Sequence, residues 1–189
     1  MRRYLLVLAA AVVALAGCTT GHDAVTKTGS TDSRYVAADG KPVVYPPAQR
    51  KDAPGVKGST VDGASADLAS LKGSVVVMNF WAAWCPPCRL ESTDLESVYK
   101  STKDSGVAFL GVNTRDEEDS AKSFEDTRMT YPSLFDPTGR IALRFSDVPP
   151  TALPCTLIID RSGKIAVVIR NGVTVASLTP LVQQIVAET

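Results

Sequence analysis

The sequence has little of what binds nucleic acids, metals or the interior of a membrane. Its 20 lysine and arginine residues are matched by 20 aspartate and glutamate residues, so it has no basic excess for nucleic-acid phosphates. Histidine occurs once in 189 residues, as His22, whereas structural zinc sites use four ligands, mostly cysteine and histidine. No apolar run reaches the roughly 20 residues of a membrane-spanning helix. We therefore expect no nucleic-acid partner, no resident metal and no transmembrane helix.

Residues 1–17 have the layout of a bacterial lipoprotein signal peptide. Two arginines precede a twelve-residue apolar run, residues 5–16, which is too short to span a membrane but suits a secretory signal. The run leads into Leu-Ala-Gly-Cys at residues 15–18, which resembles the lipobox whose cysteine becomes the lipidated first residue. We predict that Cys18 carries a lipid that holds the protein at the extracytoplasmic face of the cell membrane. An ordinary cleaved signal peptide with an incidental cysteine is the alternative.

The next segment predicts a tether followed by one globular domain. Residues 18–55 are rich in threonine, serine, aspartate, glycine and proline, and no hydrophobic period in them could bury one face. Such a composition is typical of a flexible linker. We therefore predict a lipid-anchored tether over residues 18–55 and a single folded domain over residues 56–189.

Within that domain, apolar runs alternate with a helical pattern. Residues 75–81 and 107–112 are apolar on both faces, which is typical of buried strands. Between them, apolar residues fall at helical spacing from Pro86 to about Lys103, which completes a βαβ unit.

The second half of the domain predicts a hairpin between two helices. An acidic run at residues 116–119 favours the solvated start of a helix, because carboxylates complement its positive end. Two apolar runs, residues 155–160 and 165–169, flank a short turn and predict a β-hairpin. Residues 176–187 predict a closing helix.

Two of the four cysteines form the motif Cys85-Pro-Pro-Cys88, placed between the predicted strand and helix. This placement is typical of a thioredoxin-like redox pair, because a sulfur at a helix start faces free N–H groups and the positive end of the helix dipole, which favours the thiolate. A zinc site would need a second pair of ligands. A copper carrier would need more soft ligands near the cysteines. A purely structural disulfide would close almost no loop and so add little stability.

At this point the sequence resembles the TlpA/ResA-like branch of the thioredoxin superfamily. The resemblance rests on NFWAAWCPPCRLE at residues 79–91, on Leu-x-Gly at residues 71–73 and on Pro-x-Thr-x-x-x-Asp at residues 154–160. It implies a thioredoxin-like α/β fold, with a mixed central β-sheet flanked by helices. It also implies an extracytoplasmic thiol–disulfide oxidoreductase. We expect the redox-active Cys85–Cys88 disulfide to work without a cofactor.

The resemblance also implies roles for residues around the pair. Pro154 matches the cis-proline that faces the cysteines in this superfamily, with a trans loop proline as the alternative. Glu91 matches the acidic residue of the branch and is expected to give protons to the pair or take them from it, with a plain surface glutamate as the alternative. We expect Trp84, Pro86 and Leu153 to contact the substrate.

Two positions depart from related patterns. Asn79 stands where thioredoxin itself has a buried aspartate, although it fits the TlpA/ResA pattern. Cys155 follows Pro154 directly, where a hydroxyl residue is more usual. It is either a small buried thiol that fills the core or a third redox-active cysteine.

The two prolines bear on the direction of electron flow. Neither Pro86 nor Pro87 has an N–H group, so two donors that could stabilise a Cys85 thiolate are missing. Strong oxidants need a heavily stabilised reduced form. The motif therefore predicts a reducing couple.

The hypothesis from the sequence is a monomeric reductase of disulfides in apocytochrome c or other exported proteins, re-reduced by a membrane thiol donor of the CcdA type. A disulfide oxidase or isomerase of secreted proteins is the main alternative. A non-enzymatic metal carrier is a weaker one. A thiol peroxidase is disfavoured because no Thr-x-x-Cys pattern is present.

Overall fold

The computed structural model describes residues 41–146, 150 and 152–188. The predicted signal peptide, the lipidation site Cys18 and the first part of the predicted tether lie outside these residues. Within the described ranges, no helix is both long and apolar enough to cross a membrane.

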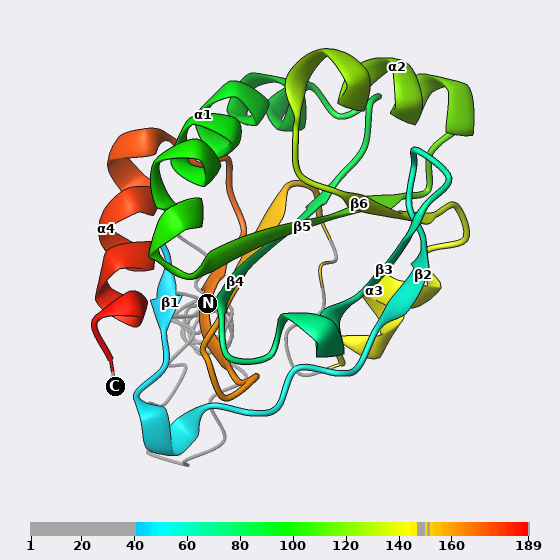
Figure 1. The fold of residues 1–189 in the computed structure, drawn as a ribbon. Helices are drawn as coiled ribbons and strands as arrows, with labels where there is room; N and C mark the ends of the chain where they lie inside the picture. The colour runs from blue at the N-terminus through cyan, green and yellow to red at the C-terminus, as the bar shows by residue number, and fades with distance from the viewer. Residues whose placement is uncertain (1–40, 147–149, 151, 189) are drawn as a thin grey trace, which may run out of the picture. The chain divides into compact units, whose positions relative to one another are not determined.

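A six-stranded mixed sheet forms the centre of the fold, in the order β1-β8-β7-β4-β5-β6 (Figure 1). Strands β4, β5 and β6 are parallel, whereas β7 is antiparallel to β4, and β8 is antiparallel to both β7 and β1. Two short strands, β2 and β3, form a separate antiparallel hairpin. The strands are β1 (Val43–Val44), β2 (Lys57–Ser59), β3 (Ser65–Asp67), β4 (Val75–Trp81), β5 (Val107–Thr114), β6 (Ser133–Asp136), β7 (Cys155–Ile159) and β8 (Ile165–Ile169).

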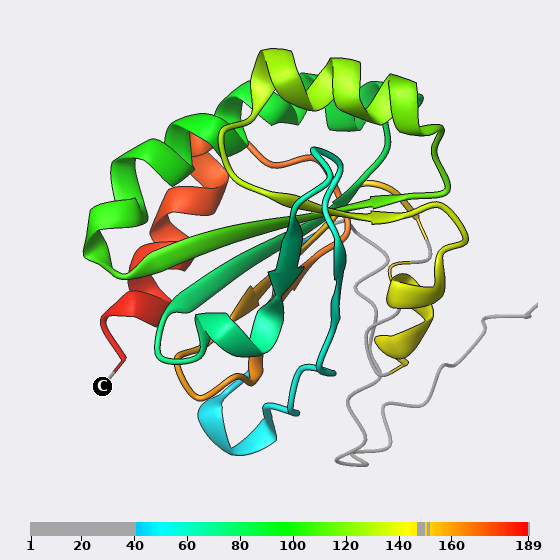
Figure 2. The same ribbon diagram turned by 45° about the vertical axis from the view of Figure 1, so that its right-hand side comes forward.

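The long helices share one side of the sheet. Figures 1 and 2 show α1, α2 and α4 together on that side, with the short α3 on the other. The α-helices are α1 (Pro86–Thr102), α2 (Glu118–Arg128), α3 (Arg140–Arg144) and α4 (Val175–Val186); the 3-10 helices are η1 (Pro47–Gln49), η2 (Leu68–Leu71) and η3 (Lys103–Ser105). The predicted α/β architecture, a mixed sheet flanked by helices, is confirmed.

Strand β4 is buried on both faces because its alternate side chains enter two separate cores. Val75 and Val77 pack with residues of the three long helices, whereas Val76 and Met78 pack with residues from η2 and α3. All seven residues of the strand are buried. This double burial explains why the strand reads as a continuous apolar run rather than an alternating one.

The shorter elements were not predicted. Strand β6 has four residues and α3 has five, so neither is long enough to show a hydrophobic period. The β2–β3 hairpin consists mainly of glycine, serine and charged residues, and its pairing comes from the fold rather than from strand propensity.

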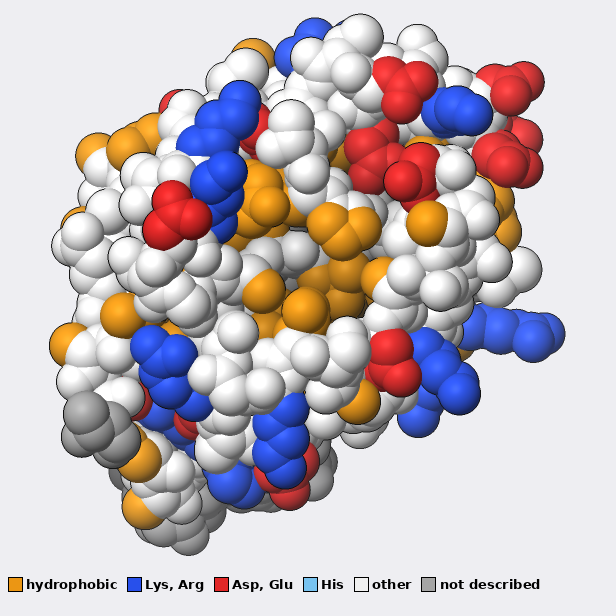
Figure 3. All heavy atoms as spheres, in the orientation of Figure 1, with side chains coloured by type: hydrophobic (Ala, Val, Ile, Leu, Met, Phe, Trp, Pro, Cys, Tyr) orange, Lys and Arg blue, Asp and Glu red, His pale blue; other side chains and the backbone are white. Residues whose placement is uncertain are grey.

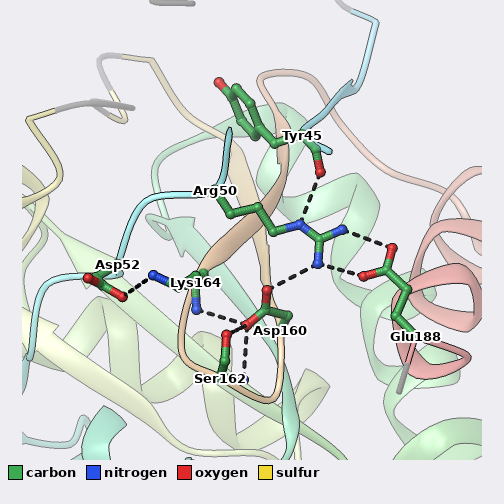
Figure 4. Close-up of polar contacts among 7 residues, drawn as sticks. All are labelled: Tyr45, Arg50, Asp52, Asp160, Ser162, Lys164 and Glu188. Atoms are coloured by element: carbon green, nitrogen blue, oxygen red, sulfur yellow. Dashed lines mark hydrogen bonds and ion pairs between the residues drawn. The ribbon is translucent and has the colours of Figure 1, made fainter. Parts of the chain in front are cut away.

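The predicted tether boundary at residue 55 is wrong, because the chain already joins the sheet at Val43. Strand β1 pairs with β8 at Val43↔Val168 and Val44↔Val167. Beyond it, Arg50 is buried against two carboxylates from distant parts of the chain (Figure 4). The composition of this segment suggested a linker, but backbone pairing and one buried ion cluster order it.

The guanidinium of Arg50 makes four contacts, and its side chain is 3% exposed. Nη1 donates to Asp160 Oδ2 at 3.1 Å and to Glu188 Oε2 at 2.5 Å, Nη2 donates to Glu188 Oε1 at 2.8 Å, and Nε donates to Tyr45 O at 3.0 Å. Burial favours a neutral carboxyl on Asp160, but hydrogen bonds from Ser162, Lys164 and Arg50 lower its pKa below the ordinary value. Arg50 thus joins the first strand, the β7–β8 turn and the end of α4.

We expect Arg50→Met to lower the free energy of unfolding by about 1–3 kcal/mol, because it leaves Asp160 and Glu188 without their buried partner. Urea denaturation measures the change. Lys164→Met is the matched control: it also removes one cation, but its ion pair with Asp52 is exposed and should contribute within about 0.5 kcal/mol. Equal midpoints for both variants would return residues 43–55 to the role of a tether.

Candidate active site

The cysteine pair lies where the central strand ends and the first long helix begins. Strand β4 ends at Trp81, and α1 starts at Pro86, with Cys85 as its N-cap residue. Proline suits the first turn of a helix because the N–H groups there have no intrahelical acceptor. The two-residue spacing therefore places one sulfur at the helix N-terminus and the other one turn further on.

Cys85 and Cys88 form a disulfide with an S–S distance of 2.04 Å and a Cα–Cα distance of 5.3 Å. Both residues are 2% exposed. The backbone N–H of Cys88 lies 3.3 Å from Cys85 Sγ and donates to it. Cys85 is thus the sulfur that faces the helix N-terminus, and it receives a donor that would stabilise its thiolate.

Three hydrogen bonds hold the loop that carries Cys85. Ala83 N donates to Asp116 Oδ2 at 2.5 Å, and Ala83 O accepts from Arg89 Nη1 at 3.2 Å. The indole Nε1 of Trp84 donates to Arg115 O at 2.8 Å. The backbone N–H and C=O of Ala83 and the side chain of Trp84 are therefore all hydrogen-bonded just before the nucleophile.

The acidic residues at positions 116–119 have two different roles. Asp116 is buried and also accepts hydrogen bonds from Asn113 Nδ2 at 2.8 Å and from Glu117 N at 2.9 Å. The prediction of a solvated helix start holds for the residues after it, which are exposed, but is wrong for Asp116. The sequence offers no signal for this contact, since it joins residues 33 positions apart.

The Leu153–Pro154 peptide bond is cis, as the resemblance implied. Strand β7 begins at the next residue, and its Cys155 pairs with Phe80 near the end of β4. The proline therefore lies at the same end of the sheet as the cysteine pair. Leu153 is half-buried and packs against the core cluster that contains Cys85 and Cys88.

Glu91 is not a plain surface glutamate, because it is 3% exposed and bonded on both oxygens. Oε1 accepts from Asn79 Nδ2 at 2.9 Å, and Oε2 accepts from Val173 N at 2.9 Å. Asn79 Nδ2 also donates to Thr156 Oγ1 at 3.0 Å. The carboxylate lies one turn after Cys88 on α1, which is neighbour range for two side chains on a helix.

The environment of Glu91 makes it able to change protonation near neutral pH. Burial raises its pKa from 4.5 to about 7, although the hydrogen bonds from Val173 and Asn79 act in the opposite direction. Among the residues that the structure describes, no lysine or arginine contributes to this shift. The absence of a cation leaves desolvation dominant, which favours the neutral carboxyl.

The expected substrate contacts are found at the rim of the site. Trp84 is 58% exposed and Pro86 is also exposed, on either side of the buried Cys85. The third residue, Leu153, is half-buried and uncharged, and it packs on the cluster that contains the redox pair. Their contact with a substrate stays a prediction.

Cys155 is a free thiol that is fully buried. Burial raises its pKa to about 12, so it stays protonated at neutral pH. A protonated, buried thiol is a poor nucleophile. This environment favours the interpretation of Cys155 as a core residue.

Away from the cysteines, the face shown in Figure 3 has a hollow with hydrophobic side chains at its floor. A cavity of about 1030 Å³ lies here between the β2–β3 hairpin, η2 and the first half of β5. None of the predicted site residues lines it. In the described residues, no group of three or more His, Cys, Asp or Glu side chains could hold a metal ion.

Comparisons with known proteins agree with this geometry. The model of the AhpC/TSA family matches residues 50–168. The chain is 32% identical over 128 residues to the thiol-disulfide oxidoreductase ResA of Bacillus subtilis, which covers 67% of this chain and 70% of ResA.

Solved structures give the same result. A secreted thiol-disulfide isomerase from Corynebacterium glutamicum matches with a TM-score of 0.75 and 30% identity, covering 82% of this chain and 97% of the other. A DsbF homologue from Corynebacterium diphtheriae matches with a TM-score of 0.73 and 31% identity, covering 79% and 97%.

We expect Glu91→Gln to remove a pH dependence of stability. A carboxyl whose folded pKa is raised takes up a proton on folding, so its contribution is full below about 4.5 and is lost as the pH rises through about 7. The wild-type free energy of unfolding should therefore fall by on the order of 3 kcal/mol over that window relative to the variant.

Urea denaturation of the oxidised proteins from pH 4 to pH 8 measures this difference. Glu125 also has a pKa raised to about 7 by burial, but it titrates in both proteins and cancels in the comparison. The absolute stabilities are not compared, because glutamine turns an N–H group towards a donor. Parallel curves would show that Glu91 keeps an ordinary pKa in the folded protein and that burial does not control it.

Proposed function

The chain belongs to the AhpC/TSA family and is a thiol–disulfide oxidoreductase with a thioredoxin-like fold; from this premise we propose that it reduces disulfides of exported proteins. The observation that carries the proposal is the Cys-Pro-Pro-Cys pair at the start of α1, with Cys88 N–H donating to Cys85 Sγ. This geometry supports an attacking Cys85 and a resolving Cys88.

The proposed reaction has two exchange steps. The Cys85 thiolate attacks one sulfur of the substrate disulfide, a mixed disulfide forms, and the other substrate sulfur leaves as a thiolate that takes up a proton. Cys88 then loses its proton and attacks Cys85 Sγ, which releases the second substrate thiol and forms the Cys85–Cys88 disulfide. Two electrons pass from the cysteine pair to the substrate. A membrane thiol donor of the CcdA type returns the pair to the reduced state.

In this scheme Glu91 accepts the proton of Cys88 in the second step. A group with a pKa of about 7 holds and releases protons with comparable ease at neutral pH. The hydrogen bonds from Asn79 and Val173 fix the carboxylate on the helix that carries both cysteines. Glu91 would therefore act next to the resolving thiol rather than on the substrate.

The reducing direction is supported by the small number of donors to Cys85. Pro86 and Pro87 supply no N–H group, and Cys88 N is the donor to Cys85 Sγ among the described residues. A hydrogen bond to a charged group contributes about 1.5–3 kcal/mol. Two missing donors therefore represent a large part of the roughly 7 kcal/mol that separates strong oxidants from thioredoxin.

For substrate and location, we propose apocytochrome c or other exported proteins, met at the extracytoplasmic face of the cell membrane. The named relatives include ResA and a secreted isomerase, and the Leu-Ala-Gly-Cys stretch ending at Cys18 supports a lipid anchor. The domain works as a monomer in this proposal. An isomerase or oxidase is the second candidate, because the structural matches include proteins that have the name of an isomerase.

We expect Cys88→Ser to accumulate mixed disulfides between Cys85 and its substrates, because the resolving thiol is absent. Non-reducing gels and mass spectrometry of cells that carry the variant identify the trapped proteins. Cys85→Ser, which keeps the other cysteine, is the matched control and should trap none. Equal trapping by both variants would remove the assignment of roles, and trapped complexes outside the membrane fraction would contradict the anchor at Cys18.

The direction is tested by the reduction potential. We expect a value below about −200 mV, nearer to thioredoxin at about −270 mV than to strong oxidants at about −120 mV. Equilibration with glutathione or dithiothreitol buffers measures it. Pro86→His should raise the potential by adding a backbone N–H and a polar ring beside Cys85. A wild-type value near −120 mV would mean that the protein oxidises its substrates.

A further inference from the structure

A second feature of the site lies beside the loop that carries Cys85. A cavity of about 690 Å³ runs between Ala83 and Trp84 on one side and helix α2 on the other. Trp84 directly precedes the nucleophile and is 58% exposed, so the groove is continuous with the active site. A polypeptide whose disulfide reaches Cys85 would pass over or beside it.

The inner wall of the groove is an aromatic ring contacted by two arginines. The guanidinium carbon of Arg89 lies 5.4 Å from the centre of the Phe124 ring, and that of Arg128 lies 4.9 Å from it. The ring itself packs on Trp81 with a centroid distance of 5.1 Å. Arg89 is further fixed by its hydrogen bond to Ala83 O at 3.2 Å. Both guanidinium groups are therefore held in place before any ligand binds.

Neither arginine has a carboxylate partner in the part of the chain that the structure describes. Among the residues that the structure describes, the ion pairs involve Arg50, Lys100 and Lys164, and none includes Arg89 or Arg128. The buried acid in the groove wall, Asp116, already accepts three hydrogen bonds. The two guanidinium groups keep unused donors beside an apolar wall.

The groove also contains two exposed acids, Glu117 and Asp119, at the start of α2. They would favour a basic partner. However, their side chains are exposed to water, where an ion pair contributes little, and an acidic side chain at a helix start already has the helix dipole as a partner. Arg89 and Arg128 are pre-organised on Phe124, so less conformational entropy is lost when they bind.

We propose that Arg89 and Arg128 select substrates with an acidic side chain next to the target disulfide. The carboxylate would bind the two guanidinium groups, and the neighbouring part of the peptide would pack on Trp84. This inference rests on the proposed function and adds to it a preference for substrates of one charge. It does not change the chemistry at the cysteines.

The test uses three peptides that share one disulfide and differ at a single flanking residue, Glu, Gln or Lys. Reduction by the pre-reduced wild-type protein is followed at low ionic strength. We expect the Glu peptide to react about tenfold faster than the Lys peptide, from one charge-assisted contact. The difference should shrink in high salt, because screening weakens exposed charge pairs.

Substitutions locate the preference. Arg128→Gln should reduce it and Arg128→Glu should reverse it, while neither touches the loop bond that Arg89 makes to Ala83. Arg144→Gln is the matched control: it removes the same charge from an exposed position on α3, on the other side of the sheet, and should keep the wild-type preference. Folding of each variant is checked by its rate with the neutral hydroxyethyl disulfide, which should not change.

Equal rates with all three peptides, or a faster Lys peptide, would overturn the groove proposal while the reductase stands. A preference that survives Arg128→Glu would do the same. Failure of the wild-type protein to reduce both the peptides and the neutral disulfide would overturn the proposed reductase and the groove together. The neutral disulfide thus separates the two failures.

Discussion

The buried carboxylate of Glu91 is the contact on which the active site depends. Its hydrogen bond with Asn79 links it to the centre of β4, and Asn79 in turn donates to Thr156 on β7. Its hydrogen bond with the N–H of Val173 links it to the loop before α4. It also lies on α1, the helix that carries both cysteines. One side chain therefore joins the elements that place the redox pair, and its desolvation gives the same group a pKa near neutrality.

The loop before the cysteines positions the nucleophile, Cys85, through hydrogen bonds to the loop rather than to the sulfur itself. Asp116 accepts from the N–H of Ala83 and Arg89 donates to its carbonyl, so both backbone groups of this residue are bound just before α1 starts. The prolines then limit how many backbone donors reach the sulfur. Rigid placement of the loop and stabilisation of the thiolate are separate properties, and the proposed reducing couple needs the first with little of the second.

Substrate choice and chemistry use different parts of the same region. The buried network of Asn79, Glu91 and Thr156 contains no cationic side chain. The exposed groove carries two arginines and two acids at its surface, on the helix α2 side. Water screens the charges of the groove but not the buried network. The charge of the groove can therefore vary without altering proton transfer at the cysteine pair.

The sequence by itself determined the redox motif, the doubly buried strand before it, the long helix after it and the hairpin that follows the cis-proline. Each is a local pattern, because hydrophobic period and spacing are read within one element. Only the tertiary structure decided that Glu91 is buried, that Asp116 holds the active-site loop and that Arg50 orders a segment with the composition of a linker. These side chains have partners 33, 82 and up to 138 residues away, and no local pattern specifies which distant group a polar side chain will meet.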